Sequence, residues 1–136
     1  MTEAQLQEQV AAYIRFQYPD TMFHSDFGSG IKLTPGQAIK QKRQNGGRRA
    51  WPDMFIAQSR CQYNPIADVW DHGLFIELKK NGTRLQKKDG SWASEHLEEQ
   101  AKVLQGLRER GYKAEFAVGF DEAKNLIDNY LGVNDK

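Results

Sequence analysis

Residues 73–79 constrain the fold of this chain more than any other segment. They read Gly-Leu-Phe-Ile-Glu-Leu-Lys, so the first half is apolar at every position and the end carries Glu77 and Lys79 two residues apart. That profile is typical of a central strand whose carboxyl end enters a cleft. Because side chains at i and i+2 of a strand share a face, Glu77 and Lys79 would project together while Leu78 turns toward the core.

A second acid comes from an earlier predicted strand. Pro52-Asp53 opens the run 53–57, and proline is tolerated at the first position of a strand. Two carboxylates from neighbouring strands, with a lysine beside them, can hold a divalent cation and an attacking water next to a phosphodiester. The other Glu-x-Lys triplet, Glu122-Ala123-Lys124, lies in an amphipathic stretch, where helical geometry points i and i+2 apart.

Length and composition predict one domain over residues 1–136. The chain is 39% hydrophobic, enough for one sizeable core but not comfortably for two. Its single cysteine, Cys61, cannot form an internal disulfide, and no Cys/His cluster has zinc-ligand spacing. The first residues lack the basic and apolar regions of a secretory signal, and no stretch approaches a membrane-spanning length. We therefore expect a cytoplasmic protein with no membrane partner.

The charge is unevenly distributed, although the chain as a whole carries only +1. The net charges of residues 1–26, 27–88 and 89–136 are −3, +8 and −4, because the middle segment has twelve bases and four acids. Two acid-free stretches, 27–52 and 78–88, border the proposed carboxylates, so the basic surface and the candidate site should coincide. The expected nucleic-acid-binding residues are Lys40, Lys42, Arg43, Arg48, Arg49, Lys80, Arg84, Lys87 and Lys88. A solvated charged loop is the alternative interpretation of each stretch.

Apolar periodicity and capping residues predict the element order α-β-α-β-β-α-β-α. The predicted strands are 22–27, 53–57, 74–79 and 114–120. The helices are predicted to begin after Thr2, Thr34, Ser94 and Asp121, and the first three to stop near Tyr18, Gly46 and Gly111. Residues 58–72 are expected to form a long connection, and residues 83–88 a hairpin or flap.

The ordered motifs of the chain resemble those of the PD-(D/E)xK nucleases. Within that superfamily the chain is similar to the small standalone VRR-NUC (virus-type replication-repair nuclease) domains of phages and bacteria. Here a glycine that commonly precedes Pro-Asp in the family is replaced by Ala50-Trp51. The matching residues are Glu3-x-x-x-Gln7-x-x-Val10-x-x-Tyr13, His24-Ser25-Asp26-Phe27-Gly28, Pro52-Asp53, Glu77-Leu78-Lys79, His96-x-x-x-Gln100, Leu107-x-x-x-Gly111-Tyr112 and Tyr130-Leu131.

The resemblance implies a fold, an activity and partners. The fold would be an α/β, restriction-endonuclease-like core, in which a central mixed four-stranded sheet is flanked by helices. The activity would be metal-dependent, structure-selective endonuclease cleavage of DNA, with Holliday junctions or other branched DNA as substrates. One site per chain cuts one strand, so symmetric cleavage of two strands would need a homodimer that supplies two sites. The setting would be a bacterial or phage-infected host cell.

The chemistry of phosphodiester hydrolysis assigns roles to the central residues. Asp53 and Glu77 are expected to bind Mg²⁺ or Mn²⁺, and Lys79 to orient or deprotonate the attacking water. By resemblance, the Leu78 backbone carbonyl is a third ligand, Glu3 is an outer acid with Glu8 as its rival, and Gln100 faces the site, where its amide could hold a water or Lys79. A surface glutamine on a helix is the alternative for Gln100.

Several other residues invite a functional interpretation that the sequence supports less well. His24 is expected to contact structure or backbone phosphate, and His72 and His96 to be loop and helix-start residues. Asp68 and Asp71 are treated as solvated. Three tryptophans would lie beside the site elements and either stack on unpaired bases or pack in the core; they are Trp51, Trp70 and Trp92.

Two further functions remain open beside the structure-selective endonuclease. One is a non-catalytic nucleic-acid-binding module on the same fold, which intact Asp53, Glu77 and Lys79 disfavour. The other is an exonuclease or restriction-type member of the same superfamily. No base-reading element such as a helix-turn-helix is evident, so affinity should come mainly from phosphate contacts and fall with salt.

Overall fold

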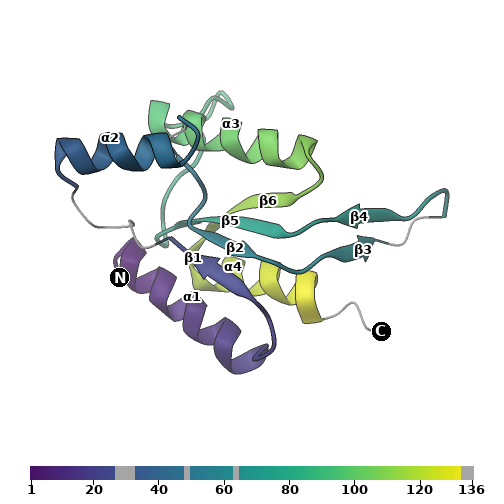
Figure 1. Cartoon of the computed structure of the whole chain (residues 1–136). Coiled ribbons are helices and arrows are strands. Elements are labelled where there is room, and N and C mark those ends of the chain that lie inside the picture. The colour runs from purple at the N-terminus through teal and green to yellow at the C-terminus, as the bar shows by residue number, and fades with distance from the viewer. Residues whose placement is uncertain (27–32, 48–49, 63–64, 133–136) are drawn as a thin grey trace.

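A four-stranded mixed sheet forms the centre of the molecule (Figure 1). The computed structural model describes residues 1–26, 33–47, 50–62 and 65–132. The strand order is β1-β2-β5-β6, with β1 (Phe23–Ser25), β2 (Met54–Ile56) and β5 (Leu74–Lys79) antiparallel in turn, and β6 (Lys113–Val118) parallel to β5. The predicted mixed sheet and its flanking helices are confirmed, and residues 74–79 form a strand with the predicted bounds.

The helices begin where the sequence predicts, with one exception. Helix α1 (Glu3–Gln17) and helix α2 (Pro35–Gln44) each start with a capping box, built on Thr2 and Thr34, and helix α3 (Glu95–Glu109) is capped by Ser94. Gly111 follows α3 with φ 95, a left-handed conformation that glycine adopts without strain. The predicted helix starts therefore reflect local hydrogen bonding that the sequence encodes directly.

The last helix departs from the prediction. Helix α4 (Gly119–Ile127) starts at Gly119 rather than after Asp121, and its N-cap, Val118, has no side-chain capping bond. Instead the Glu122 carboxylate accepts a hydrogen bond from the Val118 N–H at 2.8 Å. The helix runs on into a π-helical turn, η1 (Asp128–Gly132). Asp121 was the wrong choice because an acid inside the first turn can satisfy the free N–H groups as well as an acid before it.

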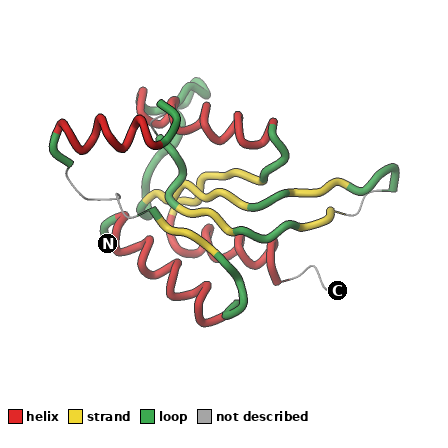
Figure 2. The backbone as a smooth tube through the Cα atoms, viewed as in Figure 1, coloured by secondary structure: helices red, strands yellow, loops and turns green. Residues whose placement is uncertain are grey.

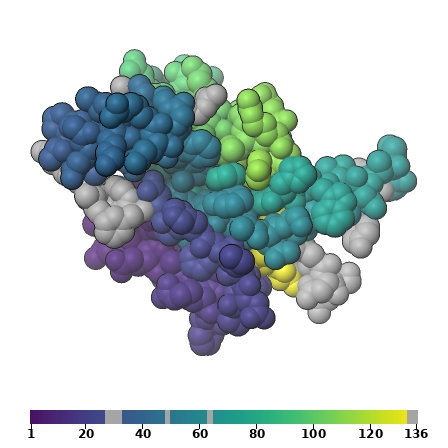
Figure 3. Space-filling view, in the orientation of Figure 1, coloured from purple at the N-terminus to yellow at the C-terminus, as the bar shows by residue number. Residues whose placement is uncertain are grey.

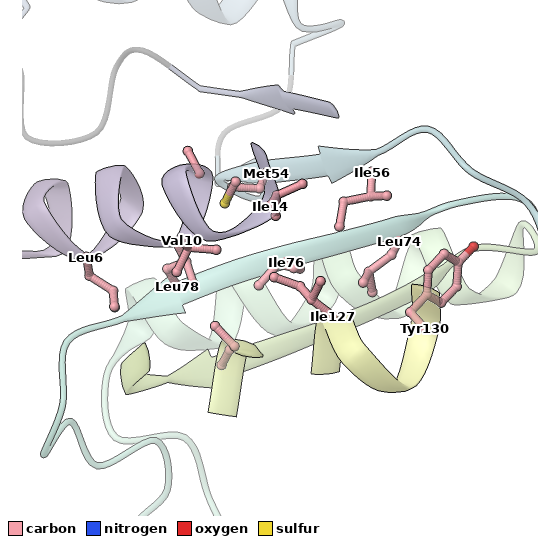
Figure 4. Close-up of a cluster of buried hydrophobic side chains, with 13 residues drawn as sticks. Leu6, Val10, Ile14, Met54, Ile56, Leu74, Ile76, Leu78, Ile127 and Tyr130 are labelled. Atoms are coloured by element: carbon pink, nitrogen blue, oxygen red, sulfur yellow. The ribbon is translucent and has the colours of Figure 1, made fainter. Parts of the chain in front are cut away.

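The main hydrophobic core lies between the sheet and the pair α1 and α4 (Figure 4). Alternate residues of β5, namely Leu74, Ile76 and Leu78, point into it and are at most 1% exposed. The opposite face of the sheet packs on α3 through a smaller cluster that includes Leu104 and Phe75. The odd-numbered residues of β5, Glu77 and Lys79 included, therefore face α3, as the two-residue period requires.

The segment 58–72 is a β-hairpin arm and not the predicted loop. Strands β3 (Arg60–Gln62) and β4 (Val69–Asp71) pair antiparallel, and the arm extends away from the sheet beyond the start of β5 (Figure 2). Asp71, predicted to be solvated, is 8% exposed and forms an ion pair with Arg60 at 3.3 Å. Trp70 is 56% exposed on this arm, so it lies at the opposite end of β5 from Glu77 and Lys79 and not beside them.

Helix α2 differs from the other helices in having no buried residue. It stands out from the surface on the same side as α3 (Figure 3). The sequence predicts this exposure, because Ile39 is its only large apolar residue, and Ile39 is 59% exposed. Within the described residues, no helix has the length and apolar character needed to cross a membrane.

Candidate active site

Two acids meet at the carboxyl end of β5. Asp53 directly precedes β2, whose Met54 pairs with Ile76, so the antiparallel register continued by one residue brings Asp53 opposite Glu77. The Leu78 N–H donates a hydrogen bond of 2.8 Å to Oδ2 of Asp53, which fixes that carboxylate beside Glu77. Glu77 is 3% exposed and points to the same face. Strand register thus creates a carboxylate pair from residues far apart in the chain.

Two polar side chains surround Glu77. The Nζ atom of Lys79 lies 3.6 Å from Oε2 of Glu77, and the Nε2 atom of Gln100 on α3 donates to that same oxygen at 3.0 Å. Lys79 is 6% and Gln100 5% exposed. Gln100 is therefore a buried residue rather than a surface glutamine, and its amide contacts Glu77 and not Lys79. The structure brings Asp53, Glu77, Lys79 and Gln100 together.

The electrostatics of the pair favour protonation or a bound cation. Burial, the charge of Asp53 and a hydrogen bond with Asp53 raise the pKa of Glu77 strongly, against the opposing charge of Lys79. Burial also raises the pKa of Asp53, although hydrogen bonds from Glu77 and Leu78 act in the other direction. Ionisation of both buried carboxyl groups is energetically unfavourable, because only one ammonium group lies beside them.

Glu3 contributes a further negative charge. The charge of Glu3 raises the pKa of both Asp53 and Glu77. Glu3 is half-buried at the start of α1, and Glu8 is exposed one turn further along. Of the two candidates for an outer acid, Glu3 is the one near the carboxylate pair.

The residues present fit a divalent cation. Oε1 of Glu77 and Oε1 of Gln100 are buried and have no hydrogen-bond partner, and a cation would satisfy such oxygens. In the described part of the chain, no three His, Cys, Asp or Glu side chains lie close enough together to bind one metal ion. The carboxylates available to a cation at this site are therefore the pair Asp53 and Glu77. Magnesium commonly binds through one or two carboxylates and keeps several waters, so this donor set matches its chemistry.

A cleft of about 550 Å³ opens over the carboxylate pair. Asp53, Glu77 and Gln100 line one side of the cleft, and α2 and the neighbouring Trp51 line the other side. A second hollow of about 660 Å³ is larger and lies between the start of α1 and Gly119, but Asp53 and Glu77 do not line it. Chemistry therefore assigns the first cleft as the candidate active site.

The cleft includes a histidine that was not predicted to be part of the site. His96 lies one helical turn before Gln100 on α3 and lines the cleft beside it. The spacing of four residues, which places two side chains on one helix face, was the signal that could have identified it. Two of the tryptophans expected beside the site elements differ, because Trp51 lines the cleft whereas Trp92 packs on Phe116.

The basic residues predicted to bind nucleic acid fall into two groups. Lys40, Lys42 and Arg43 are exposed on α2, and Lys42 also lines the cleft. The second group follows β5 on a connection that folds back on itself through the bridge between Gln86 and Trp92. Its exposed members are Lys80, Arg84, Lys87 and Lys88. Arg48 and Arg49 lie outside the described residues, as do Phe27 and Gly28 of the motif set.

Comparison with solved structures finds a near full-length relative. A protein named "VRR_NUC domain protein" is 26% identical to this chain and has a TM-score of 0.64, and the match covers 98% of this chain and 91% of that one. No protein-family model and no curated protein matches the chain. The structural match supports the resemblance to VRR-NUC domains that the sequence motifs indicate.

Proposed function

We propose that this protein is a metal-dependent, structure-selective DNA endonuclease that hydrolyses phosphodiester bonds of Holliday junctions or other branched DNA. The observation that supports this most is the convergence of Asp53, Glu77 and Lys79 at one strand end, under an open cleft. The name of the structural relative also supports a nuclease. The PD-(D/E)xK core and the small phage or bacterial type belong to the same proposal.

Asp53 and Glu77 would hold Mg²⁺ or Mn²⁺, with the Leu78 carbonyl as a third ligand. When bound, the cation supplies charge neutralisation at the scissile phosphate and polarises water. Lys79, which lies beside Glu77, would orient the attacking water and stabilise negative charge that develops on the phosphate. Gln100 would hold the Glu77 carboxylate in place through its amide hydrogen bond, and Glu3 would add negative charge behind the pair.

The basic residues of α2 and of the connection after β5 would bind the DNA backbone. One site per chain cuts one strand, so symmetric cleavage of a junction needs two copies, and a two-fold homodimer is the simplest source. We expect the enzyme to act in the cytoplasm of a bacterial or phage-infected cell.

The experiment that tests the function compares the wild type with Asp53→Asn on labelled DNA. The panel consists of duplex, single-stranded, flap and four-way-junction DNA of the same length, each with Mg²⁺, Mn²⁺ or EDTA. We expect cutting only with a divalent cation, preference for a branched substrate, and a loss of at least about a hundredfold in Asp53→Asn, since a cation ligand is removed. Asparagine can still accept the Leu78 N–H, so the variant should fold.

Each of the other possible outcomes would indicate a different function. DNA binding without cutting in either metal would favour the non-catalytic module, and equal cutting by Asp53→Asn would remove the carboxylate pair from the mechanism. Stepwise shortening from an end would indicate an exonuclease, and cutting at one duplex sequence a restriction-type enzyme.

A further inference from the structure

Helix α2 forms a wall of the cleft without being packed into the fold. None of its residues is buried, and its capping box and the glycines after it hold its ends. Most helical stability in proteins comes from burial of an apolar face, and α2 has only Ile39 to offer. A helix that is kept in place yet buries nothing has a surface available for a ligand.

The side of α2 that faces the carboxylates is apolar at its centre. Ala38 and Ile39 line the cleft, and Ile39 is 59% exposed there. Trp51 extends this apolar wall and is itself rigid, because its ring packs on Phe75 and its Nε1–H donates to the Asn45 carbonyl at 3.3 Å. An aromatic ring held by the core is the kind of platform on which a base stacks.

The positive charge of α2 and the volume of the cleft indicate which kind of ligand binds against this apolar wall. Lys42 lines the same cleft, α2 has no acid, and Lys40 and Arg43 are exposed on the helix. A volume of about 550 Å³ lies within the range of pockets that hold one small molecule, so a single nucleotide fits.

We propose that the cleft takes one unpaired nucleotide of the scissile strand. Its base lies against Ile39 and Trp51, and its phosphate lies toward Asp53 and Glu77. This inference rests on the proposed function and adds its selection rule: DNA is cut where a nucleotide is already unpaired or easily unstacked. Extruding a base from a duplex costs a few kcal/mol, and an unpaired base avoids that cost. Flaps, gaps and junction centres all supply such a nucleotide.

Binding in the absence of cleavage tests the inference. All proteins carry Asp53→Asn, and EDTA is present. The probes are a single-stranded oligonucleotide and a fully paired duplex of the same sequence, each with 2-aminopurine, whose fluorescence reports unstacking from its neighbours. Ile39→Ala is the variant, and Ile66→Ala is the matched control, because Ile66 is 95% exposed on the hairpin arm.

We expect Ile39→Ala to weaken single-strand binding about tenfold, in line with the loss of one base contact. Binding of the paired duplex should stay unchanged, and so should both affinities in Ile66→Ala. The fluorescence change on single-strand binding should be smaller in Ile39→Ala. Equal affinities of Ile39→Ala and the control for both probes, or an equal loss for both probes, would overturn the inference. Misfolding is no concern, because Ile39 belongs to a helix without buried residues.

The inference and the function fail in different ways. A wild type that cuts branched DNA with Mg²⁺, combined with single-strand binding that is indifferent to Ile39, removes only the unpaired-nucleotide site. A wild type that binds the single strand through Ile39 but cuts nothing in either metal removes the nuclease, and with it the scissile assignment of the nucleotide.

Discussion

At the scale of the residue, Glu77 is in conflict with its surroundings. It is 3% exposed, lies next to the Asp53 carboxylate, and has one oxygen without a hydrogen-bond partner. An acid in such a place destabilises the folded state when it ionises. Unfavourable electrostatics of this kind are common at ligand-binding sites, where the bound ligand compensates for them. A cation between the two carboxylates would neutralise their negative charge.

Glu77→Gln should therefore stabilise the metal-free protein, by about 1 kcal/mol. Glutamine keeps the shape and removes the charge that burial and Asp53 oppose. The pKa of Glu77 is raised in the folded state, so between the unfolded pKa of about 4.3 and the folded pKa the folded protein binds more protons than the unfolded protein. The free energy of unfolding of the wild type in EDTA should therefore increase as the pH falls from 8 toward 5. That of the variant should increase less. Urea denaturation in EDTA measures both effects.

The same pair of proteins reports on the cation. Mn²⁺ should raise the melting temperature of the wild type and leave that of Glu77→Gln nearly unchanged, because a ligand that binds only the folded state stabilises it. A variant that is less stable than the wild type in EDTA, or that gains as much from Mn²⁺, would contradict the assignment of Glu77.

At the scale of the element, Asp128 joins helix α1 to the π-helical turn η1. Its Oδ1 accepts hydrogen bonds from the hydroxyls of Tyr13 and Tyr18, both at 2.6 Å, and its Oδ2 accepts from Lys124 at 2.8 Å. Burial alone would raise the pKa of Asp128, but the hydrogen bonds from Lys124 and the two tyrosines outweigh it and lower that pKa. One carboxylate thus ties α1 to η1.

Asp128→Asn should lower the free energy of unfolding by about 1–3 kcal/mol at neutral pH, because one amide cannot accept all three hydrogen bonds. Since the folded pKa is lowered, this stabilisation is fully present above the unfolded pKa of about 3.9 and disappears as the pH falls through the folded value. The difference between the two proteins should therefore narrow below about pH 4, which urea titrations at several pH values measure.

Asp121→Asn is the control for this variant. It makes the same charge change in α4, the helix that continues into η1, at an exposed acid that does not cap α4. We expect a change within about 0.5 kcal/mol. An equal effect of the two substitutions would show that charge near α4, and not the tyrosine hydrogen bonds, stabilises the fold.

At the scale of the whole molecule, charge is sorted along the chain and around the site. The middle segment, 27–88, carries +8. Its described bases, apart from Arg60 on the hairpin arm, lie on α2, at the carboxyl end of β5 and on the connection that follows β5. Arg110 and Lys113 lie instead at the amino end of β6, which is the opposite end of the parallel pair. The two ends should therefore differ in their contribution to DNA binding.

The double variant Lys87→Ala/Lys88→Ala should weaken DNA binding. It should also reduce the slope of log Kd against log salt concentration by about one to two, because each lost phosphate contact removes about 0.9 from that slope. Fluorescence anisotropy over a salt series measures it. Arg110→Ala/Lys113→Ala removes the same charge at the other end and should change the slope little. Equal slopes for the two variants would mean that net charge, and not position, governs binding. The same measurement on Arg48→Ala/Arg49→Ala tests the prediction that the sequence makes for those residues.

Local features of this protein follow from the sequence alone. The capping boxes at Thr2 and Thr34, the Ser94 cap and the bounds of β5 depend on residues within a few positions of one another, and propensity and hydrogen bonding act at that range. The shared face of Glu77 and Lys79 follows from the strand period in the same way. The hairpin β3–β4 was missed because its strands are only three residues long and lack a clear alternation.

The arrangement of the site was decided by the tertiary structure. Asp53 meets Glu77 because β2 pairs with β5 in one register, and a slip of one residue would turn Asp53 to the other face. The contact of Gln100 with Glu77, the choice of Glu3 over Glu8 and the position of α2 over the cleft depend on how helices pack on that sheet. The sequence named the chemical groups through short-range patterns, whereas their distances depend on contacts between segments more than twenty residues apart, which no local pattern encodes.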